Sequence, residues 1–330
     1  MSSTATNPCA LPLAQWVAAT APTLASAGLV GVAYSGGADS TALLLAAKAC
    51  LGERLVALHV NHGLQEAASA FEAHAKAFCH THDIAIRVAQ RQVAVRTGQS
   101  LEEQARLARY QALSELAQQR QSCTVVLLAQ HAQDQLETIL IALSRGAGLP
   151  GLSAMASNFE RHGQRFARPI LGVQAQAIRD WLCAHEHAFV NDPSNADMSL
   201  TRNRIRAHVL PALEQALPGV AQAALRSAQH AAQAHSALQA YAQQDAQLTG
   251  LPPSIQALQA LLARSEAAGI NVLRYWLAQT PGATPSTAQL HQLVSQIKAC
   301  TTRGHSIHLK VGAGHVRRVG DALAYAPPII

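Results

Sequence analysis

The 330-residue sequence predicts an α/β protein: a parallel sheet covered by helices, then a mostly helical C-terminal domain that ends in a small antiparallel sheet. In the first two thirds of the chain, short apolar runs alternate with longer segments of helical periodicity, which is typical of parallel sheets. Near the end, the apolar period changes from helical to alternating, which indicates short strands. The length favours two domains, and we place them at residues 1–215 and 216–330.

In the first domain, strands are predicted at apolar runs, and helices at the segments rich in Ala, Leu, Glu and Gln that follow them. The predicted strands cover residues 29–34, 55–60, 84–88 and 124–130. The predicted helices cover residues 41–49, 67–82, 101–119 and 133–144. Ligands of such sheets bind beyond the C-terminal ends of the strands, so we expect the chemistry there.

The alternating pattern breaks between residues 146 and 168, where a Gly-rich turn is followed by a polar, basic segment. Residues 190–199 read as a loop, and Pro211 is expected to kink its helix. Further helices are predicted at residues 173–187, 204–215, 221–246, 254–267, 271–278 and 287–299. The terminal strands are predicted at residues 306–311, 315–319 and 322–325.

Positive charge is concentrated in the second domain. Residues 1–215 hold 17 Lys and Arg against 16 Asp and Glu, whereas residues 216–330 hold 8 against 3, a net charge of +5. A basic module with few acids suits the phosphate backbone of a nucleic acid, and solubility explains the same surplus equally well.

Cysteine usage and hydropathy favour the cytoplasm. The six cysteines lie far apart and form no Cys-x-x-Cys, which favours reduced thiols over a disulfide framework or a zinc site. No apolar run reaches membrane-spanning length, and the first ten residues do not resemble a signal peptide. We therefore expect no membrane association, and the sequence leaves a homodimer open.

A strand, a glycine turn and a helix N-terminus follow one another around residues 29–49, and together they make an anion site. Glycines let the backbone approach a bound anion, and the free amides of the first helical turn point at it. The alternative is a plain glycine turn between strand and helix. We expect ligand contacts from the loop residues Ser35, Gly36, Gly37, Ala38, Asp39, Ser40 and Thr41.

Asp39 is the unexpected member of this loop, because a carboxylate repels phosphate. It is explained if Asp39 binds Mg²⁺, which then bridges to the phosphates. The loop lacks Gly-Lys-Ser/Thr, so it is not the phosphate loop of kinases and GTPases. Ser-Gly-Gly-x-Asp-Ser resembles the pyrophosphate loop (PP-loop) of the ATP pyrophosphatase superfamily, which implies a Rossmann-like fold and transfer of AMP from ATP.

Two carboxylates follow the strand at residues 124–130. Asp134 and Glu137 are three residues apart, so on a helix they share a face. Beside a nucleotide site they are suited to sharing Mg²⁺ or to deprotonating an attacking amine. The alternative is an acidic first helical turn that complements the helix dipole.

Further segments resemble the bacterial tRNA(Ile)-lysidine synthase family, in family order over roughly residues 29–211. They are His131-Ala132-Gln133-Asp134-Gln135-Leu136-Glu137-Thr138, Arg145-Gly146, Gly151-Leu152-Ser153-Ala154-Met155, His59-Val60-Asn61-His62-Gly63-Leu64, Ser100 to Tyr110, Asp192-Pro193-Ser194-Asn195 and Arg202-Asn203-Arg204-Ile205-Arg206. The resemblance implies that ATP adenylates the wobble cytidine of a tRNA(Ile) with a CAU anticodon, and that free L-lysine then displaces AMP to form lysidine. It also implies catalytic roles for Asp39, Asp134, Glu137 and Arg202.

The sequence departs from the family pattern at two positions and in its length. Gln133 stands where the family usually has the first of two aspartates, and Gln65 where it often has arginine. Well-known longer relatives carry a further C-terminal domain, which leaves open how the acceptor stem is recognised.

Several cationic and imidazole side chains are candidate contacts. Arg202 and Arg206 share a helix face, with Arg204 offset, and we expect them to contact phosphate or tRNA. Strand-end positions make His59 and His131 candidates for nucleotide contact, with His62 beside them, although a packed histidine explains the same positions. Arg161, Arg165 and Arg168 are expected to extend this groove, and Lys310, Arg317 and Arg318 to form a basic patch on the terminal sheet.

Two other functions keep the same loop. A tRNA thiolase or an amide-forming ligase would share it, but the first normally needs reactive cysteines and the second an ammonia source, and the sequence shows neither. A non-enzymatic RNA-binding protein with a degenerate nucleotide fold is the third interpretation, and the intact loop at Ser35 to Ser40 argues against it.

Overall fold

The computed structural model describes residues 6–20, 28–61, 68–91, 101–119, 121–280, 282–302 and 304–327. The predictions for His62, Gln65 and Ser100 lie outside these residues. The chain divides into two compact units, Met1–Gln229 and His230–Ile330, which meet within one long helix, α10 (Val220–Thr249). Each unit is described by itself below.

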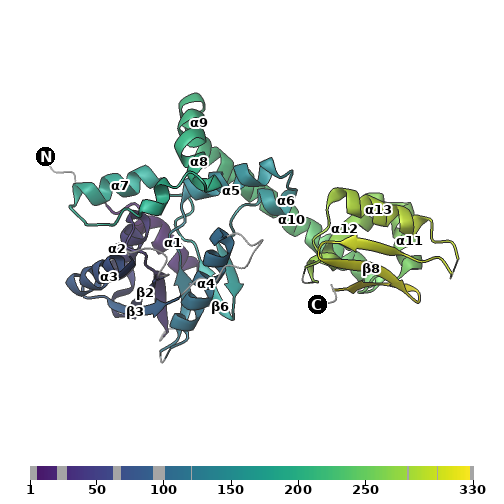
Figure 1. Ribbon diagram of the computed structural model, residues 1–330, viewed down its shortest axis with the longest axis horizontal. Coiled ribbons are helices and arrows are strands. Elements are labelled where there is room, and N and C mark those ends of the chain that lie inside the picture. The colour runs from purple at the N-terminus through teal and green to yellow at the C-terminus, as the bar shows by residue number, and fades with distance from the viewer. Residues whose placement is uncertain are drawn as a thin grey trace. The chain divides into compact units, whose positions relative to one another are not determined.

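The first unit contains one sheet with helices around it (Figure 1), and its six strands lie in the order β3-β2-β1-β4-β6-β5. All neighbouring strands run parallel except β5, which pairs antiparallel with β6 at the sheet edge. The strands are β1 (Leu29–Ala33), β2 (Leu55–Asn61), β3 (Ala85–Gln90), β4 (Cys123–Leu127), β5 (Asn158–Arg161) and β6 (Gln164–Ala167). The predicted parallel sheet is confirmed, with an antiparallel edge added.

Helices pack on both faces of this sheet. The helices of the first unit are α1 (Ala10–Thr20), α2 (Ala38–Leu51), α3 (Ala68–Thr81), α4 (Leu101–Ala117), α5 (Ala132–Ser144), α6 (Leu149–Leu152), α7 (Ala175–Ala184), α8 (Thr201–Arg204) and α9 (Leu210–Ala216). Alternate residues of β4 divide between two cores, because successive side chains of a strand point to opposite faces. Val125 and Leu127 join the core of α1, α2 and α7, whereas Val126 joins that of α4.

The hairpin of β5 and β6 corrects the sequence analysis, which found only a break in the pattern here. His162 and Gly163 both have positive φ, at 49° and 69°, and they close a tight turn between the two strands. Phe159 and Phe166 face one another across the hairpin and stack at 5.2 Å between ring centroids. The charged residues of these short strands interrupt the apolar pattern that would otherwise predict them.

The helix that carries the arginine cluster changes its winding before Pro211. A π-helical turn, Ile205–Val209, lies between α8 and α9, and the N–H of Leu210 donates to the carbonyl of Ile205. Proline has no N–H and crowds the carbonyl four residues earlier, so it disrupts the regular ladder. The predicted disturbance at Pro211 is therefore present as a wider turn just ahead of it.

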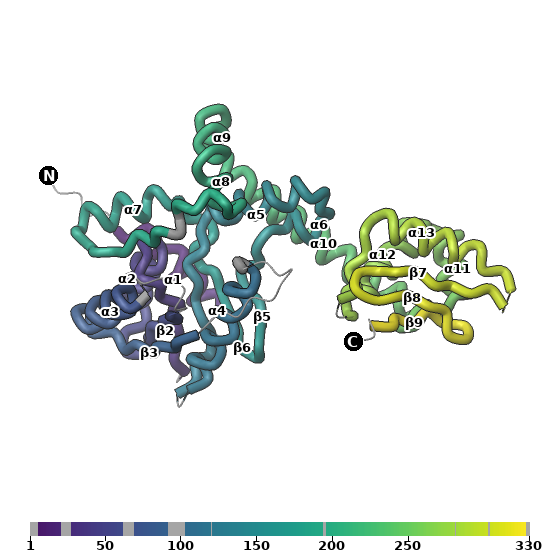
Figure 2. The backbone as a smooth tube through the Cα atoms, viewed as in Figure 1, coloured from purple at the N-terminus to yellow at the C-terminus, as the bar shows by residue number. Residues whose placement is uncertain are grey.

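The second unit packs three helices against a three-stranded antiparallel sheet, with its strands side by side in the order β7-β8-β9 (Figure 2). Its core joins apolar residues of α11 to α13 and of all three strands, among them Leu258, Trp276, Leu293 and Val316. Its elements are the C-terminal part of α10, then α11 (Ile255–Arg264), α12 (Glu266–Ala278), α13 (Thr287–Lys298), β7 (His308–Val311), β8 (Gly314–Val319) and β9 (Ala322–Ala326). The predicted terminal sheet is confirmed.

Candidate active site

The loop between β1 and α2 is shaped by one glycine in a conformation that other residues avoid. Gly36 has φ of 86°, and its carbonyl accepts a hydrogen bond from the N–H of Val190 at 2.9 Å. Gly37 then caps α2, which begins at Ala38, three residues before the predicted start. The first amides of a helix have no partner within it, so this turn presents donors to an anion.

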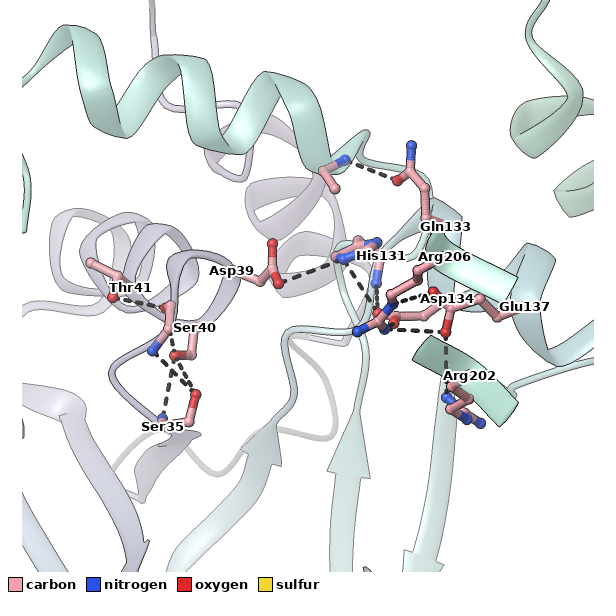
Figure 3. Close-up of polar contacts among 12 residues, drawn as sticks. Ser35, Asp39, Ser40, Thr41, His131, Gln133, Asp134, Glu137, Arg202 and Arg206 are labelled. Carbon is pink, nitrogen blue, oxygen red and sulfur yellow. Dashed lines mark hydrogen bonds and ion pairs between the residues drawn. The ribbon is translucent and has the colours of Figure 1, made fainter. Parts of the chain in front are cut away.

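Serine hydroxyls hold this loop in shape. The Oγ atoms of Ser35 and Ser40 lie 3.1 Å apart, and Ser40 also donates to the carbonyl of Gly37 at 2.9 Å (Figure 3). Ser35 is exposed, whereas Thr41 is fully buried and donates to the same Gly37 carbonyl at 2.9 Å. The hydroxyl of Thr41 thus stabilises the turn from beneath, and Ser35 is the hydroxyl that a ligand can reach.

Asp39 projects from the first turn of α2 towards His131, which precedes α5 (Figure 3). Nε2 of His131 lies 3.5 Å from Oδ2 of Asp39 and 3.6 Å from Oδ2 of Asp134. Burial of His131 by itself lowers its pKa, but the neighbouring carboxylates of Asp39 and Asp134 outweigh burial and raise that pKa above 6.5. The imidazole therefore joins the PP-loop to the acidic helix, and the two carboxylates favour its protonated form.

Asp134 and Glu137 lie on one face of α5, as their spacing predicts, and both bind Arg206. Asp134 accepts from Nη2 of Arg206 at 2.8 Å, and Glu137 accepts from Nε at 2.5 Å and from Nη2 at 3.1 Å. Arg202 lies further away, with Nη1 at 3.9 Å from Oε2 of Glu137. The predicted shared face of Arg202 and Arg206 is confirmed, and it faces the two carboxylates (Figure 3).

The side chain of Glu137 is fully buried, whereas 42% of the Arg206 side chain is exposed. Burial raises the pKa of Glu137, and the hydrogen bond and charge of Arg206 only partly oppose that rise. A raised carboxyl pKa brings Glu137 closer to the range in which a general base operates.

Gln133 does not join this cluster. Its Oε1 accepts from the N–H of Ala175, the first residue of α7, at 2.9 Å, and its Nε2 donates to Gln174 at 3.3 Å. An acceptor at this position satisfies one of the unpaired amides of a helix N-terminus. Gln133 therefore connects α5 to α7, a task that needs an acceptor oxygen but no charge.

His59 is placed by the structure under the loop. It is 3% exposed, and its Nδ1 lies 2.9 Å from the carbonyl of Tyr34. A carbonyl only accepts, so Nδ1 carries the proton, and burial lowers the pKa of this imidazole. These contacts hold the ends of β1 and β2 together and agree with the packed-histidine alternative for His59.

Arg168 differs in placement from the expected groove. Arg168 is 8% exposed, donates to Gln130, to the carbonyl of Ala156 and to the hydroxyl of Tyr110, and lies over the ring of Phe159. Arg161 lies over the ring of Tyr110. Arg168 is thus a buried side chain that links strands and loops through its hydrogen bonds. The prediction that it lies in an exposed groove is wrong.

Asp39 suits a bound cation. Its Oδ1 is buried and has no hydrogen-bond partner among the described residues, and Nδ1 of His131 is in the same state. No group of three or more His, Cys, Asp or Glu in the described parts of the chain forms a complete metal site. Mg²⁺ usually takes one or two carboxylates and completes its shell with phosphates and water, so one carboxylate facing a phosphate loop fits it.

Val190 is not singled out in the sequence analysis, and Arg206 is assigned different partners there. Val190 fixes Gly36 from a segment far along the chain, and no local pattern marks it. Arg206 was expected to contact phosphate or tRNA, whereas it binds the two carboxylates.

Among the described residues, no helix combines the length and apolarity needed to cross a membrane.

Comparison with known proteins identifies the family. Residues 13–213 match the family model of the PP-loop domain, and residues 257–324 match that of the TilS substrate binding domain. The chain is 51% identical to the tRNA(Ile)-lysidine synthase of Polaromonas naphthalenivorans, over 90% of this chain and 89% of that protein.

Longer relatives and a solved structure are also similar. The chain is 38% identical to the tRNA(Ile)-lysidine synthase of Burkholderia pseudomallei over 82% of this chain, but spans only 56% of that protein. The solved structure of the U34-tRNA thiolase NcsA from Methanococcus maripaludis aligns with a TM-score of 0.53 and 14% identity, over 66% of this chain and 78% of that one. That likeness shows a shared fold. Together with the PP-loop geometry, these matches show that the chain belongs to the tRNA(Ile)-lysidine synthase family of ATP-dependent ligases.

Proposed function

We propose that this chain transfers AMP from ATP to the C2 carbonyl oxygen of the wobble cytidine in tRNA(Ile) with a CAU anticodon, and then lets L-lysine displace the AMP. The observation that carries the proposal is the arrangement of Asp39, His131 and the acidic face of α5 around the PP-loop. Residues 1–215 would carry the chemistry, and the basic residues 216–330 would bind the tRNA.

The loop residues Ser35, Gly36, Gly37, Ala38 and Ser40 would hold the phosphates of ATP. The amides of the first turn of α2 and the exposed hydroxyl of Ser35 supply donors, and the dipole of α2 favours the negative charge. The buried side chains of Thr41 and His59 would stabilise the conformation of the loop through their hydrogen bonds. When bound, Mg²⁺ would neutralise phosphate charge at Asp39.

His131 would act next to the phosphates. Asp39 and Asp134 favour the protonated form of its imidazole, which would offer a donor to an anionic oxygen at this position. The pyrophosphate leaving group gains charge as its bond to AMP breaks, so a cation here lowers the cost of that step.

Asp134 and Glu137 would receive lysine. Its ε-ammonium needs acceptors to bind and must lose a proton before the nitrogen attacks C2, and two carboxylates on one helix face meet both needs. Arg202 lies beside Glu137 and would hold a phosphate near the reacting cytidine.

The thiolase alternative is not supported by the thiols. All six cysteines are free, and four of them are buried. Burial raises the pKa of Cys9, and the negative charge of Asp39 adds a smaller rise, to about 12 in total. The thiol of Cys9 therefore stays protonated at neutral pH.

Two measurements test the proposal together. Exchange of labelled pyrophosphate into ATP, with and without tRNA(Ile), reports adenylation, and the mass of the tRNA product after reaction with lysine reports lysidine. We expect tRNA-dependent exchange and a mass gain equal to lysine minus water. Exchange without any lysine adduct would identify another acceptor and contradict the proposal.

A further inference from the structure

The guanidinium of Arg206 occupies the place where a lysine ammonium would be bound. It donates to Asp134 through Nη2 and to both oxygens of Glu137 through Nε and Nη2, at distances of 2.5 to 3.1 Å. The second oxygen of Asp134 accepts from the backbone N–H of His131 at 3.0 Å. All four carboxylate oxygens therefore already have a donor.

A lysine ammonium cannot take the carboxylate oxygens to which the guanidinium of Arg206 donates without strong repulsion from that guanidinium. Glu137 is fully buried and the side chain of Asp134 is only 12% exposed, so water screens little of the repulsion between a guanidinium and an ammonium bound to the same oxygens. The bidentate contact is also the strong, directional kind of charged hydrogen bond. Lysine and the guanidinium of Arg206 thus compete for one subsite.

Arg206 is more exposed than the two carboxylates that it binds. Its side chain is 42% exposed, and its backbone belongs to the π-helical turn Ile205–Val209 ahead of Pro211. Such turns hold a local change of helical register and are frequent at functional sites. The two carboxylates, by contrast, lie on the regular helix α5 within the first unit.

We propose that Arg206 fills the ammonium subsite until an incoming phosphate group draws its guanidinium away, so that lysine binds only after a phosphate-bearing substrate. This inference rests on the proposed function of Asp134 and Glu137. Withdrawal of Arg206 leaves two largely buried carboxylates without their strongest partner, and an unpaired buried charge is costly in free energy. The lysine ammonium then replaces the positive charge that Arg206 supplied. Arg206 is then a positioning residue that sets the order of binding.

The test measures the affinity of the full chain for L-lysine by calorimetry. The arms are protein alone, protein with a non-hydrolysable ATP analogue, and protein with tRNA(Ile), which distinguishes nucleotide phosphate from RNA phosphate. For the wild type we expect lysine affinity to rise at least about tenfold in one of the two phosphate arms. Arg206→Gln should show that raised affinity in protein alone and gain little more from either substrate.

Two variants serve as matched controls. Arg206→Lys keeps a cation at the subsite, and it should behave as the wild type does. Arg204 lies on the same segment but donates to the backbone carbonyls of Met198 and Ser199 and to the hydroxyl of Thr201, so Arg204→Gln should leave lysine affinity unchanged.

Three results would overturn the inference. One is an equal lysine affinity in all three wild-type arms, a comparison that needs no variant. Another is weaker lysine binding by folded Arg206→Gln in protein alone, because Arg206 would then support the subsite rather than fill it. Failure of the proposed function is separate: it would show as the absence of lysidine from the tRNA product, whatever the order of binding.

Discussion

Nε2 of His131 lies 3.5 Å from Oδ2 of Asp39, and this contact joins the N-terminus of α5 to the first turn of α2. The two residues are far apart in sequence and follow different strands, β4 and β1, which are neighbours in the sheet. Adjacent parallel strands end at the same edge, so their following turns meet there. An imidazole and a carboxylate are thereby placed beside the PP-loop amides.

This pair predicts a pH dependence. Burial lowers the pKa of His131, but Asp39 and Asp134 outweigh it, and the net shift from 6.5 is upward. A raised pKa means that the native state binds the proton more tightly than the unfolded chain does. The stability from this contact is present below pH 6.5 and is lost as the pH rises through the raised value. We expect the NMR titration of His131 to have a midpoint above 6.5, and Asp39→Asn to lower it; a wild-type midpoint at or below 6.5 contradicts the interpretation.

Asp39→Asn should also remove most of the adenylation activity. The amide retains the size of the side chain, so the fold should be retained. Mg²⁺ loses its anionic ligand, and we expect the rate of pyrophosphate exchange to fall about a hundredfold or more. Near-normal exchange at saturating Mg²⁺ would exclude the proposed role of Asp39.

Glu137→Gln tests the lysine subsite. The variant keeps an acceptor for Arg206 but removes the charge and the basic oxygen, so the KM for lysine should rise by more than the KM for ATP. Asp180, an exposed carboxylate on α7 bonded to Gln176, provides a control as Asp180→Asn. Equal increases in both KM values would point to a metal-binding or structural role for Glu137.

Local pattern predicted the parts of this site that depend on spacing. Asp134 and Glu137 were expected on one helix face, as were Arg202 and Arg206, and the structure has both arrangements. The pairing of these two faces could not be predicted, because it joins residues 69 and 72 positions apart through tertiary packing. The β5–β6 hairpin was not predicted because its strands are only four residues long and their charged residues interrupt the apolar pattern.

Gln133 shows how a departure from a family pattern can be read in structural terms. Gln133→Ala removes the acceptor for the N–H of Ala175 at the start of α7, and we expect a loss of about 1 kcal/mol in the free energy of unfolding. Gln133→Glu retains an acceptor oxygen and should keep most of that stability. Gln176→Ala, at an exposed position on α7, serves as the control in urea unfolding. A loss of adenylation without a loss of stability in Gln133→Ala would instead assign Gln133 to the chemistry.

The three cationic side chains expected to form a basic patch on the terminal sheet differ in their exposure. Lys310 and Arg317 are exposed on one face, opposite His315 and His308 in the register of β7 and β8. The side chain of Arg318 is only 10% exposed and donates to the carbonyls of Gly320, Thr302 and His305, so its expected place in an exposed basic patch is wrong.

We therefore expect Lys310→Gln with Arg317→Gln to weaken tRNA binding and to flatten its dependence on salt by about two in the log–log slope, since two fewer phosphate contacts release counterions. Arg318→Gln should instead lower the free energy of unfolding by about 1 kcal/mol, because three backbone carbonyls lose a charged donor, and leave the slope unchanged. Filter binding of tRNA(Ile) at several salt concentrations measures the slope. An unchanged slope in the double variant would show that this face does not contact RNA, and the net charge of +5 over residues 216–330 would then serve solubility alone.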